Sequence, residues 1–94
     1  MAVYFVTWDL NKEKTGYIAA RDRLLKKIDQ FPNTKDPGLD SVRFISSSQS
    51  SEQLAKFIKE AMDSNDSLMV MKMSGGDYYG YLQASTWEWI NSNR

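Results

Sequence analysis

The segment Val3-Tyr-Phe-Val-Thr-Trp-Asp-Leu10 decides the fold of this 94-residue chain. β-Branched and aromatic residues make up most of the segment, and both of its alternating faces are apolar until Asp9. A strand with two apolar faces is typical of the centre of a sheet. The segment therefore predicts a central strand that ends in a carboxylate.

The following segments predict a helix, a weak strand and a clear strand. Apolar residues recur at helical spacing over 17–31, with Thr15 as a candidate cap and Pro32 as the stop. Residues 33–40 directly follow Pro32 and contain the other proline, Pro37, next to Gly38, which predicts a loop or a short, irregular edge strand. Val42-Arg-Phe-Ile45 predicts the next strand.

Two later helices are each expected to begin at a capping box. Ser50 and Gln53 fit this pattern ahead of a second helix, and Ser85 and Glu88 fit it ahead of a short, tryptophan-rich terminal helix. In a capping box the first side chain accepts a hydrogen bond from the third backbone N–H, so each match marks a helix start.

Between these two helices, the sequence predicts a strand, a turn and a possible further strand. Residues 67–73 are the strand, 74–77 the turn and 78–82 the possible edge strand. Alternation within the first strand is expected to place one set of side chains on a common face, namely Met69, Met71 and Met73.

The order of elements predicts the fold class. A β-α-β-β-α-β series followed by a tail favours an α+β domain over residues 1–94 with the ferredoxin-like βαββαβ arrangement. Its small, mostly antiparallel sheet would carry two helices on one face, followed by a short carboxy-terminal aromatic tail. The other face would then be open, so we expect a homodimer to cover it.

Composition excludes several kinds of chemistry. The chain has no cysteine and no histidine, which excludes cysteine–histidine and serine–histidine catalysis and zinc-hydrolase chemistry. Twelve basic and twelve acidic residues give a net charge of zero, so binding of nucleic acid by bulk charge is not expected. Short apolar runs and a start without a basic region predict no membrane segment and a cytoplasmic protein.

Asp9 is the sharpest candidate for a catalytic and metal-binding residue. A carboxylate at the end of a central strand lies at the sheet edge, and in a two-fold dimer two such aspartates can share a hard divalent cation such as Mg²⁺. The alternative is that Asp9 begins an Asx-type turn through Asn11.

Aromatic and basic residues supply candidate binding surfaces. Tyr79 and Trp87 belong to an aromatic cluster that is able to stack nucleobases or to pack a protein interface. Arg21 and Arg23 lie on the first predicted helix, where the alternative to phosphate contact is a solvated surface. Arg43, in the third predicted strand, is a further candidate for contact with phosphate.

Four stretches of the chain resemble a known family, in the correct order. These are Thr7-Trp-Asp-Leu-Asn11, Leu39-Asp-Ser-Val-Arg-Phe-Ile45, Ser50-Ser-Glu-Gln-Leu54 and Asp63-Ser-Asn-Asp-Ser-Leu-Met-Val-Met71. They are similar to the strand ends and helix starts of small SinR-like proteins. That family is related to the CRISPR-associated endoribonuclease Cas two and to the VapD toxin nucleases.

The resemblance implies a ferredoxin-like homodimer in which Asp9 is the aspartate associated with metal binding and phosphodiester cleavage. It also implies that Ser41, Arg43 and Phe44 lie near Asp9 on the neighbouring strand. The chain departs from the family in the two prolines at and just after the start of its second-strand region, Pro32 and Pro37, in its lack of surplus basic charge and in its aromatic tail.

The sequence therefore leaves two functions open. The first is a Mg²⁺-dependent endoribonuclease or nuclease of a defence or toxin–antitoxin system, in which Asp9 holds the metal and Arg43 stabilises developing charge on RNA or DNA. The second is a non-catalytic dimeric module that binds a protein partner or a small nucleotide. Composition favours the second, and the family resemblance favours the first.

Overall fold

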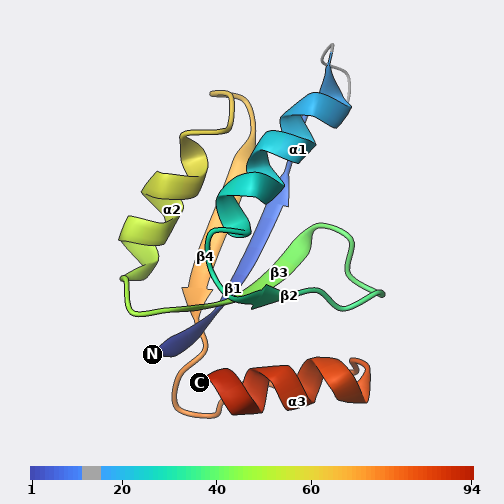
Figure 1. Cartoon of the computed structure of the whole chain (residues 1–94), viewed down its shortest axis with the longest axis vertical. Helices are drawn as coiled ribbons and strands as arrows, with labels where there is room; N and C mark the ends of the chain where they lie inside the picture. Colours follow the sequence, from blue (N-terminus) through green and yellow to red (C-terminus); the bar gives the residue numbers. More distant parts are fainter. Residues whose placement is uncertain (12–15) are drawn as a thin grey trace.

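The computed structural model describes residues 1–11 and 16–94 as an antiparallel sheet with three helices (Figure 1). The candidate cap Thr15 lies outside the described residues. In chain order the elements are β1 (Ala2–Asp9), α1 (Tyr17–Ile28), β2 (Asn33–Thr34), β3 (Val42–Ser47), α2 (Ser51–Lys59), β4 (Ser67–Lys72) and α3 (Ala84–Asn93). The α+β class is therefore confirmed.

The strand β1 lies inside the sheet, whose order is β2-β3-β1-β4, and every neighbouring pair is antiparallel. Val6 of β1 lies opposite Arg43 of β3 on one side and opposite Val70 of β4 on the other. The prediction of a central strand at this position is confirmed. Both faces of β1 pack against apolar residues, which explains its lack of polar alternation.

The weak strand predicted in 33–40 is β2, which has only two residues. Asn33 lies opposite Ile45, and Thr34 lies opposite Phe44. β2 begins directly after Pro32, and Pro37 follows three residues after its end. Proline has no backbone N–H and therefore cannot donate a hydrogen bond to a neighbouring strand. The strand is therefore short and lies at an edge.

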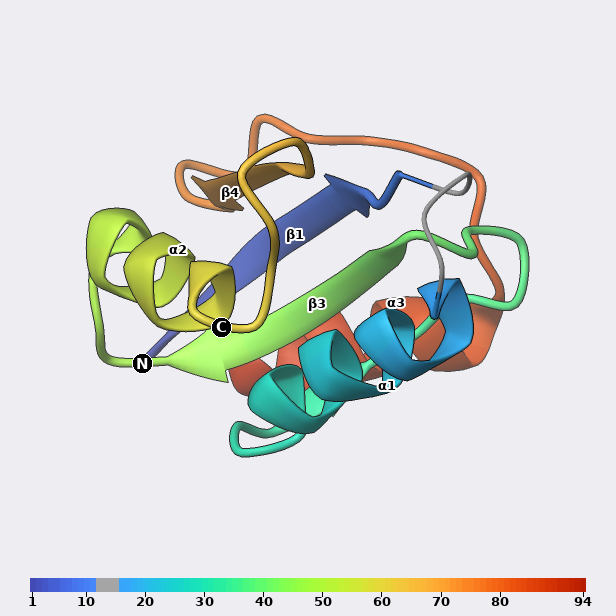
Figure 2. The same cartoon turned by 90° about the horizontal axis from the view of Figure 1, so that it is seen from above.

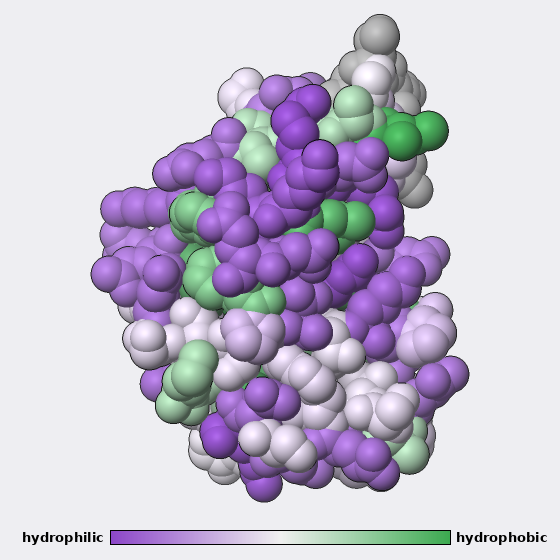
Figure 3. Space-filling model, viewed as in Figure 1, coloured by the Kyte–Doolittle hydropathy of each residue, from purple (hydrophilic) through white to green (hydrophobic). Residues whose placement is uncertain are grey.

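The first face of the sheet, here called the helical face, packs against α1 and α2 (Figure 2). Tyr4, Val6 and Trp8 of β1 point to this face, and the helices contribute side chains with no exposed surface, namely Leu24, Ile28, Leu54 and Ile58. Figure 3 shows that the outward sides of the two helices are mostly hydrophilic. One apolar stripe on each helix therefore makes the main core.

The second face, here called the α3 face, packs against the terminal helix. Val3, Val42, Phe44 and Ile90 form its buried cluster, and in Figure 1 α3 lies below β2 and β3, away from α1 and α2. The face expected to await a partner is thus partly covered by the chain itself. Met69 and Met71 of β4 stay exposed on it, at 60% and 51%.

The two predicted capping boxes have different outcomes. Ser50 and Gln53 form both hydrogen bonds of the box at the start of α2, which confirms the first prediction. The second prediction was wrong, because α3 begins after Gln83 with no capping hydrogen bond from that side chain. The polar group at this helix start comes instead from a distant residue, Asp36.

The segment between β4 and α3 also differs in part from expectation. The predicted turn at 74–77 is present, with Gly75 and Gly76 at φ of 73° and 69°, values that glycine adopts without strain. The possible edge strand at 78–82 was wrong, because this segment pairs with no strand. Tyr78 of this segment instead packs in the cluster of the α3 face, where it stacks on Trp87.

Candidate functional site

Asp9 is the last residue of β1, is exposed to solvent and lies opposite Ser67 of β4. Alternation along β1 places its side chain on the same face as Val3 and Phe5, which is the α3 face. The carboxylate is therefore accessible at the end of the central strand, as the sequence predicted.

The described residues around Asp9 do not by themselves make up a metal site. Among the described residues there is no group of three or more carboxylate, histidine or cysteine side chains able to hold an ion. A Mg²⁺ ion is bound with octahedral geometry, through carboxylates together with water or substrate oxygens. One carboxylate supplies too little of that set, so the site would need a second copy of the chain or a substrate to complete it.

Arg43 lies on the opposite face from Asp9. It pairs with Val6 and points to the helical face, where its guanidinium carbon is 5.7 Å from the centroid of the Trp8 ring. Burial lowers the pKa of Arg43, and the charge of Arg21 lowers it further, whereas Asp29 acts in the other direction. The structure therefore does not bring Asp9 and Arg43 together.

Ser41 and Phe44 occupy different positions along the neighbouring strand. The Ser41 carbonyl accepts hydrogen bonds from the Trp8 N–H at 3.2 Å and from the Thr7 hydroxyl at 3.1 Å, so Ser41 lies beside the end of β1. Phe44 lies opposite Phe5, with the two ring centroids 5.8 Å apart. Phe5 is four residues from Asp9, or about 13 Å along an extended strand. Of the two, only Ser41 is adjacent to the end of β1.

The cations of α1 do not form one patch. Arg21 is half-buried and lies near Arg43, whereas Arg23 is exposed. Lys27 donates to the Glu60 carboxylate at 2.7 Å and lies over the Phe57 ring. The helix therefore directs its basic side chains to different surroundings, as the solvated-surface alternative predicts.

Tyr79 and Trp87 are brought together, in an apolar groove of ≈ 380 Å³ on the α3 face. Tyr78 stacks on Trp87 with ring centroids 6.3 Å apart, and Tyr79 meets Tyr81 edge-to-face at 5.6 Å. Tyr79 and Tyr81 are 85% and 93% exposed. The groove, here called the aromatic groove, is lined by Phe5, Leu39, Phe44, Met71, Met73, Tyr78, Tyr79, Gly80, Tyr81, Leu82 and Trp87.

Asp36 is a buried carboxylate that sequence reasoning missed, and it holds one wall of the aromatic groove in place. It accepts hydrogen bonds from the Gln83 N–H at 2.9 Å, the Thr86 hydroxyl at 2.8 Å and the Gly38 N–H at 3.0 Å. The Gln83 bond first, and then the Thr86 bond, lower the pKa of Asp36 below its ordinary value, although burial acts in the other direction.

The sequence carried only a local signal for Asp36. The run Asp36-Pro-Gly38 is a typical turn, in which the carboxylate accepts from the N–H two residues later. Nothing in that run points to a helix that begins 48 residues later. The negative charge favours the positive end of the α3 dipole, so Asp36 fixes the start of α3 from a distance.

Comparison with protein-family models and with curated proteins finds no match for this chain. Among the described residues, no helix is both long enough and apolar enough to cross a membrane. The site therefore has to be interpreted from its own geometry.

Proposed function

We propose that this chain is a ferredoxin-like, non-catalytic interaction module of the cytoplasm that binds a protein partner through the aromatic groove. The strand order β4-β1-β3-β2 supports the ferredoxin-like assignment, as do the crossover helices α1 and α2 on one face. The observation that carries the function is the groove itself, which exposes Tyr79 and Tyr81 to solvent beside Met71.

The composition of the groove favours a protein over a nucleotide. None of its lining residues is charged, so it offers no cation to neutralise a phosphate. Exposed tyrosines beside methionine are typical of protein interfaces, where their apolar area is buried while the hydroxyl stays hydrogen-bonded. A partner that presents an apolar, uncharged surface fits this lining.

The test is affinity capture followed by calorimetry on the purified partner. We expect Tyr79→Ala with Tyr81→Ala to weaken binding by more than about tenfold, because exposed aromatic anchors carry much of the energy of an interface. Ile18→Ala is the matched control, since Ile18 is an apolar residue of α1 with 76% exposure. Equal binding by the tyrosine variant and the wild type would reject the groove as the binding surface.

We also propose that the module is a homodimer. Its support is the exposed side chain of Met69 on the α3 face, which lies outside the aromatic groove, together with the neighbouring exposed Met71 of β4. Sedimentation equilibrium at micromolar concentration should give twice the chain mass of 10.8 kDa. A measured mass equal to that of one chain at concentrations up to about a hundred micromolar would contradict the dimer.

A second candidate function is a metal-dependent nuclease, and the exposure of Asp9 at the end of β1 favours it. Because the described residues supply no full donor set around Asp9, this function needs a second copy of the chain or substrate oxygens to complete the site. The assay uses labelled single- and double-stranded RNA and DNA with Mg²⁺, Mn²⁺ or EDTA. Cleavage should be lost in Asp9→Asn and kept in Asp22→Asn, a control on the exposed side of α1. Equal cleavage by both variants eliminates Asp9 as the metal residue.

A further inference from the structure

The outer edge of β4 carries backbone groups that no strand occupies. β4 is the last strand of the sheet and pairs only with β1. The Met73 N–H donates to the Val3 carbonyl at 2.9 Å. Because hydrogen-bonded pairs alternate along an antiparallel ladder, the backbone groups of Met69 and Met71 also point to β1. Those of the intervening residues, namely Leu68, Val70 and Lys72, point to the free edge.

In the described part of the chain, this edge lacks the proline, the central charged residues and the covering segment that protect the edge strands of many proteins from pairing with an additional strand. Within the described residues no hydrogen bond engages the outward N–H or C=O groups of Leu68, Val70 or Lys72. The strand has six residues without proline, and Lys72, at its end, is its one charged residue. An uncovered edge of this kind is a template for an added strand.

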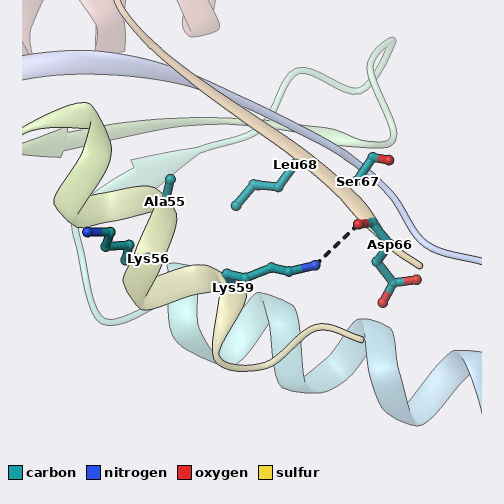
Figure 4. Close-up of a pocket in the computed structure, with 6 residues that line it drawn as sticks. All are labelled: Ala55, Lys56, Lys59, Asp66, Ser67 and Leu68. Atoms are coloured by element: carbon teal, nitrogen blue, oxygen red, sulfur yellow. Dashed lines mark hydrogen bonds between the residues drawn. The ribbon is translucent and has the colours of Figure 1, made fainter. Parts of the chain in front are cut away.

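A basic groove runs beside the start of this edge, between α2 and β4. Its volume is ≈ 520 Å³, and its lining is Ala55, Lys56, Lys59, Asp66, Ser67 and Leu68 (Figure 4). The Lys59 ammonium is held at the groove by the carbonyls of Asp63 and Asp66, at 2.7 Å and 3.2 Å. Figure 4 shows this side chain reaching from α2 toward the strand.

Two acidic groups near this groove are already engaged. The Asp66 carboxylate accepts hydrogen bonds from the N–H groups of Asn11 and Asp63, both at 2.9 Å. Glu52 pairs with Lys56 at 2.7 Å, but both side chains are about three-quarters exposed, so water screens that pair. The edge therefore presents Lys56 and Lys59 at one end and Lys72 at the other.

We propose that the free edge of β4 binds an extended acidic segment of a partner protein as an added strand. The outward backbone groups of Leu68, Val70 and Lys72 supply the hydrogen bonds, and the three lysines attract the carboxylates of the segment. A second copy of this chain is disfavoured at this edge, because it would bring its own three lysines against the first three. This surface is separate from the aromatic groove and does not depend on it.

The probe is a fluorescein-labelled peptide of nine residues in which glutamate and valine alternate, followed by fluorescence anisotropy with the whole chain. We expect saturable binding that weakens as salt is added. Lys56→Glu with Lys72→Glu should weaken it about tenfold, whereas Lys26→Glu with Lys35→Glu, on exposed lysines elsewhere, should leave it unchanged. Equal weakening by the two pairs would overturn the proposal, because binding would then follow net charge alone.

Two further measurements distinguish strand addition from simple charge attraction. A peptide with N-methyl groups on the alternate amides that face β4 lacks the N–H donors for the β4 carbonyls, and the methyl groups keep its backbone from close approach. It should bind at least about tenfold more weakly. Hydrogen exchange should slow at the amides of Leu68, Val70 and Lys72 when the unmodified peptide is added. Equal affinity of the methylated and the unmodified peptide would reject an added strand at this edge. Equal affinity of a peptide in which lysine and valine alternate would reject the preference for an acidic segment.

Discussion

The two faces of the sheet are built in different ways, although they share the strand β1. On the helical face, two helices contribute four side chains with no exposed surface, and a continuous core results. On the α3 face, Ile90 is the large apolar side chain of α3 that is wholly buried, and Tyr79 and Tyr81 of the aromatic groove stay exposed. The helical face stabilises the fold, and the α3 face keeps apolar surface for binding.

The starts of α2 and α3 show the same contrast on a smaller scale. α2 is capped by residues within its own sequence, through Ser50 and Gln53. At α3 the capping group is the carboxylate of Asp36, which lies in the loop after β2. The far end of α3 is held by a side chain of β3, because the Ser46 hydroxyl donates to the Asn93 carbonyl at 3.2 Å. Long-range polar contacts thus hold α3 at both ends.

The largest expected effect tests whether the helical face is the main core. Ile58→Ala should lower the free energy of unfolding by about 2–5 kcal/mol, because it leaves a cavity among fully buried side chains. Urea denaturation measures this change. Ile18→Ala is the control, and this exposed position should change stability by no more than about 0.5 kcal/mol. A similar decrease in the free energy of unfolding for both variants would show that Ile58 contributes no more to stability than an exposed residue.

The next effect tests whether α3 opens separately from the rest. Ile90→Ala should lower the opening free energy of α3 by about 2 kcal/mol, which speeds amide exchange in 84–93 by about thirtyfold. Amides of α1 and α2 should keep the protection of the wild type. Uniform acceleration in all three helices would mean that both faces form one cooperative core.

A pH titration tests the long-range cap. The folded pKa of Asp36 is lowered from 3.8, so its contribution to stability is complete above 3.8 and is lost as pH falls through the folded value. Thermal unfolding of the wild type should therefore show a loss below 3.8 that Asp36→Asn lacks. Asp40→Asn, at an exposed position in the same loop, should keep the wild-type profile. Identical pH profiles for the wild type and Asp36→Asn would show that the charge of Asp36 does not stabilise the start of α3.

The smallest effect compares the two predicted capping boxes. Ser50→Ala should lower the free energy of unfolding by about 1 kcal/mol, because it removes the acceptor for the Gln53 N–H. Ser85→Ala should change it by less than about 0.5 kcal/mol, since Ser85 is exposed and caps nothing. Guanidinium denaturation of the two variants measures the difference. A larger loss at Ser85 than at Ser50 would reverse this assignment.

Elements whose signals are local were predictable from the sequence. The two apolar faces of 3–10 predicted the central strand, and the spacing of apolar residues predicted α1 and α2. The methionine alternation was also correct, since Leu68 and Val70 pack against the helical face and Met73 packs against the α3 face. Each of these patterns repeats within one element, so no distant contact was needed to interpret it.

The errors occurred where a distant contact overrides a local pattern. Residues 78–82 have strand composition, but they pair with no strand and their Tyr78 stacks on Trp87. The motif at Ser85 has no capping role, because Asp36 accepts the hydrogen bonds at the start of α3. For the candidate site, the sequence predicted that Asp9 ends the central strand. It did not predict that Arg43 points to the opposite face, because that depends on the register between β1 and β3.

The sequence by itself determined the helices α1 and α2, the strands β1, β3 and β4, where β1 ends, and which kinds of catalysis the absence of histidine and cysteine excludes. The tertiary structure alone decided that α3 covers part of the second face, that Asp36 holds it there, and that β4 has a free edge between lysines. The physical reason is the separation along the chain over which each kind of interaction acts. Periodicity and capping act over a few residues, whereas burial of a carboxylate and exposure of an edge depend on segments far apart in the chain.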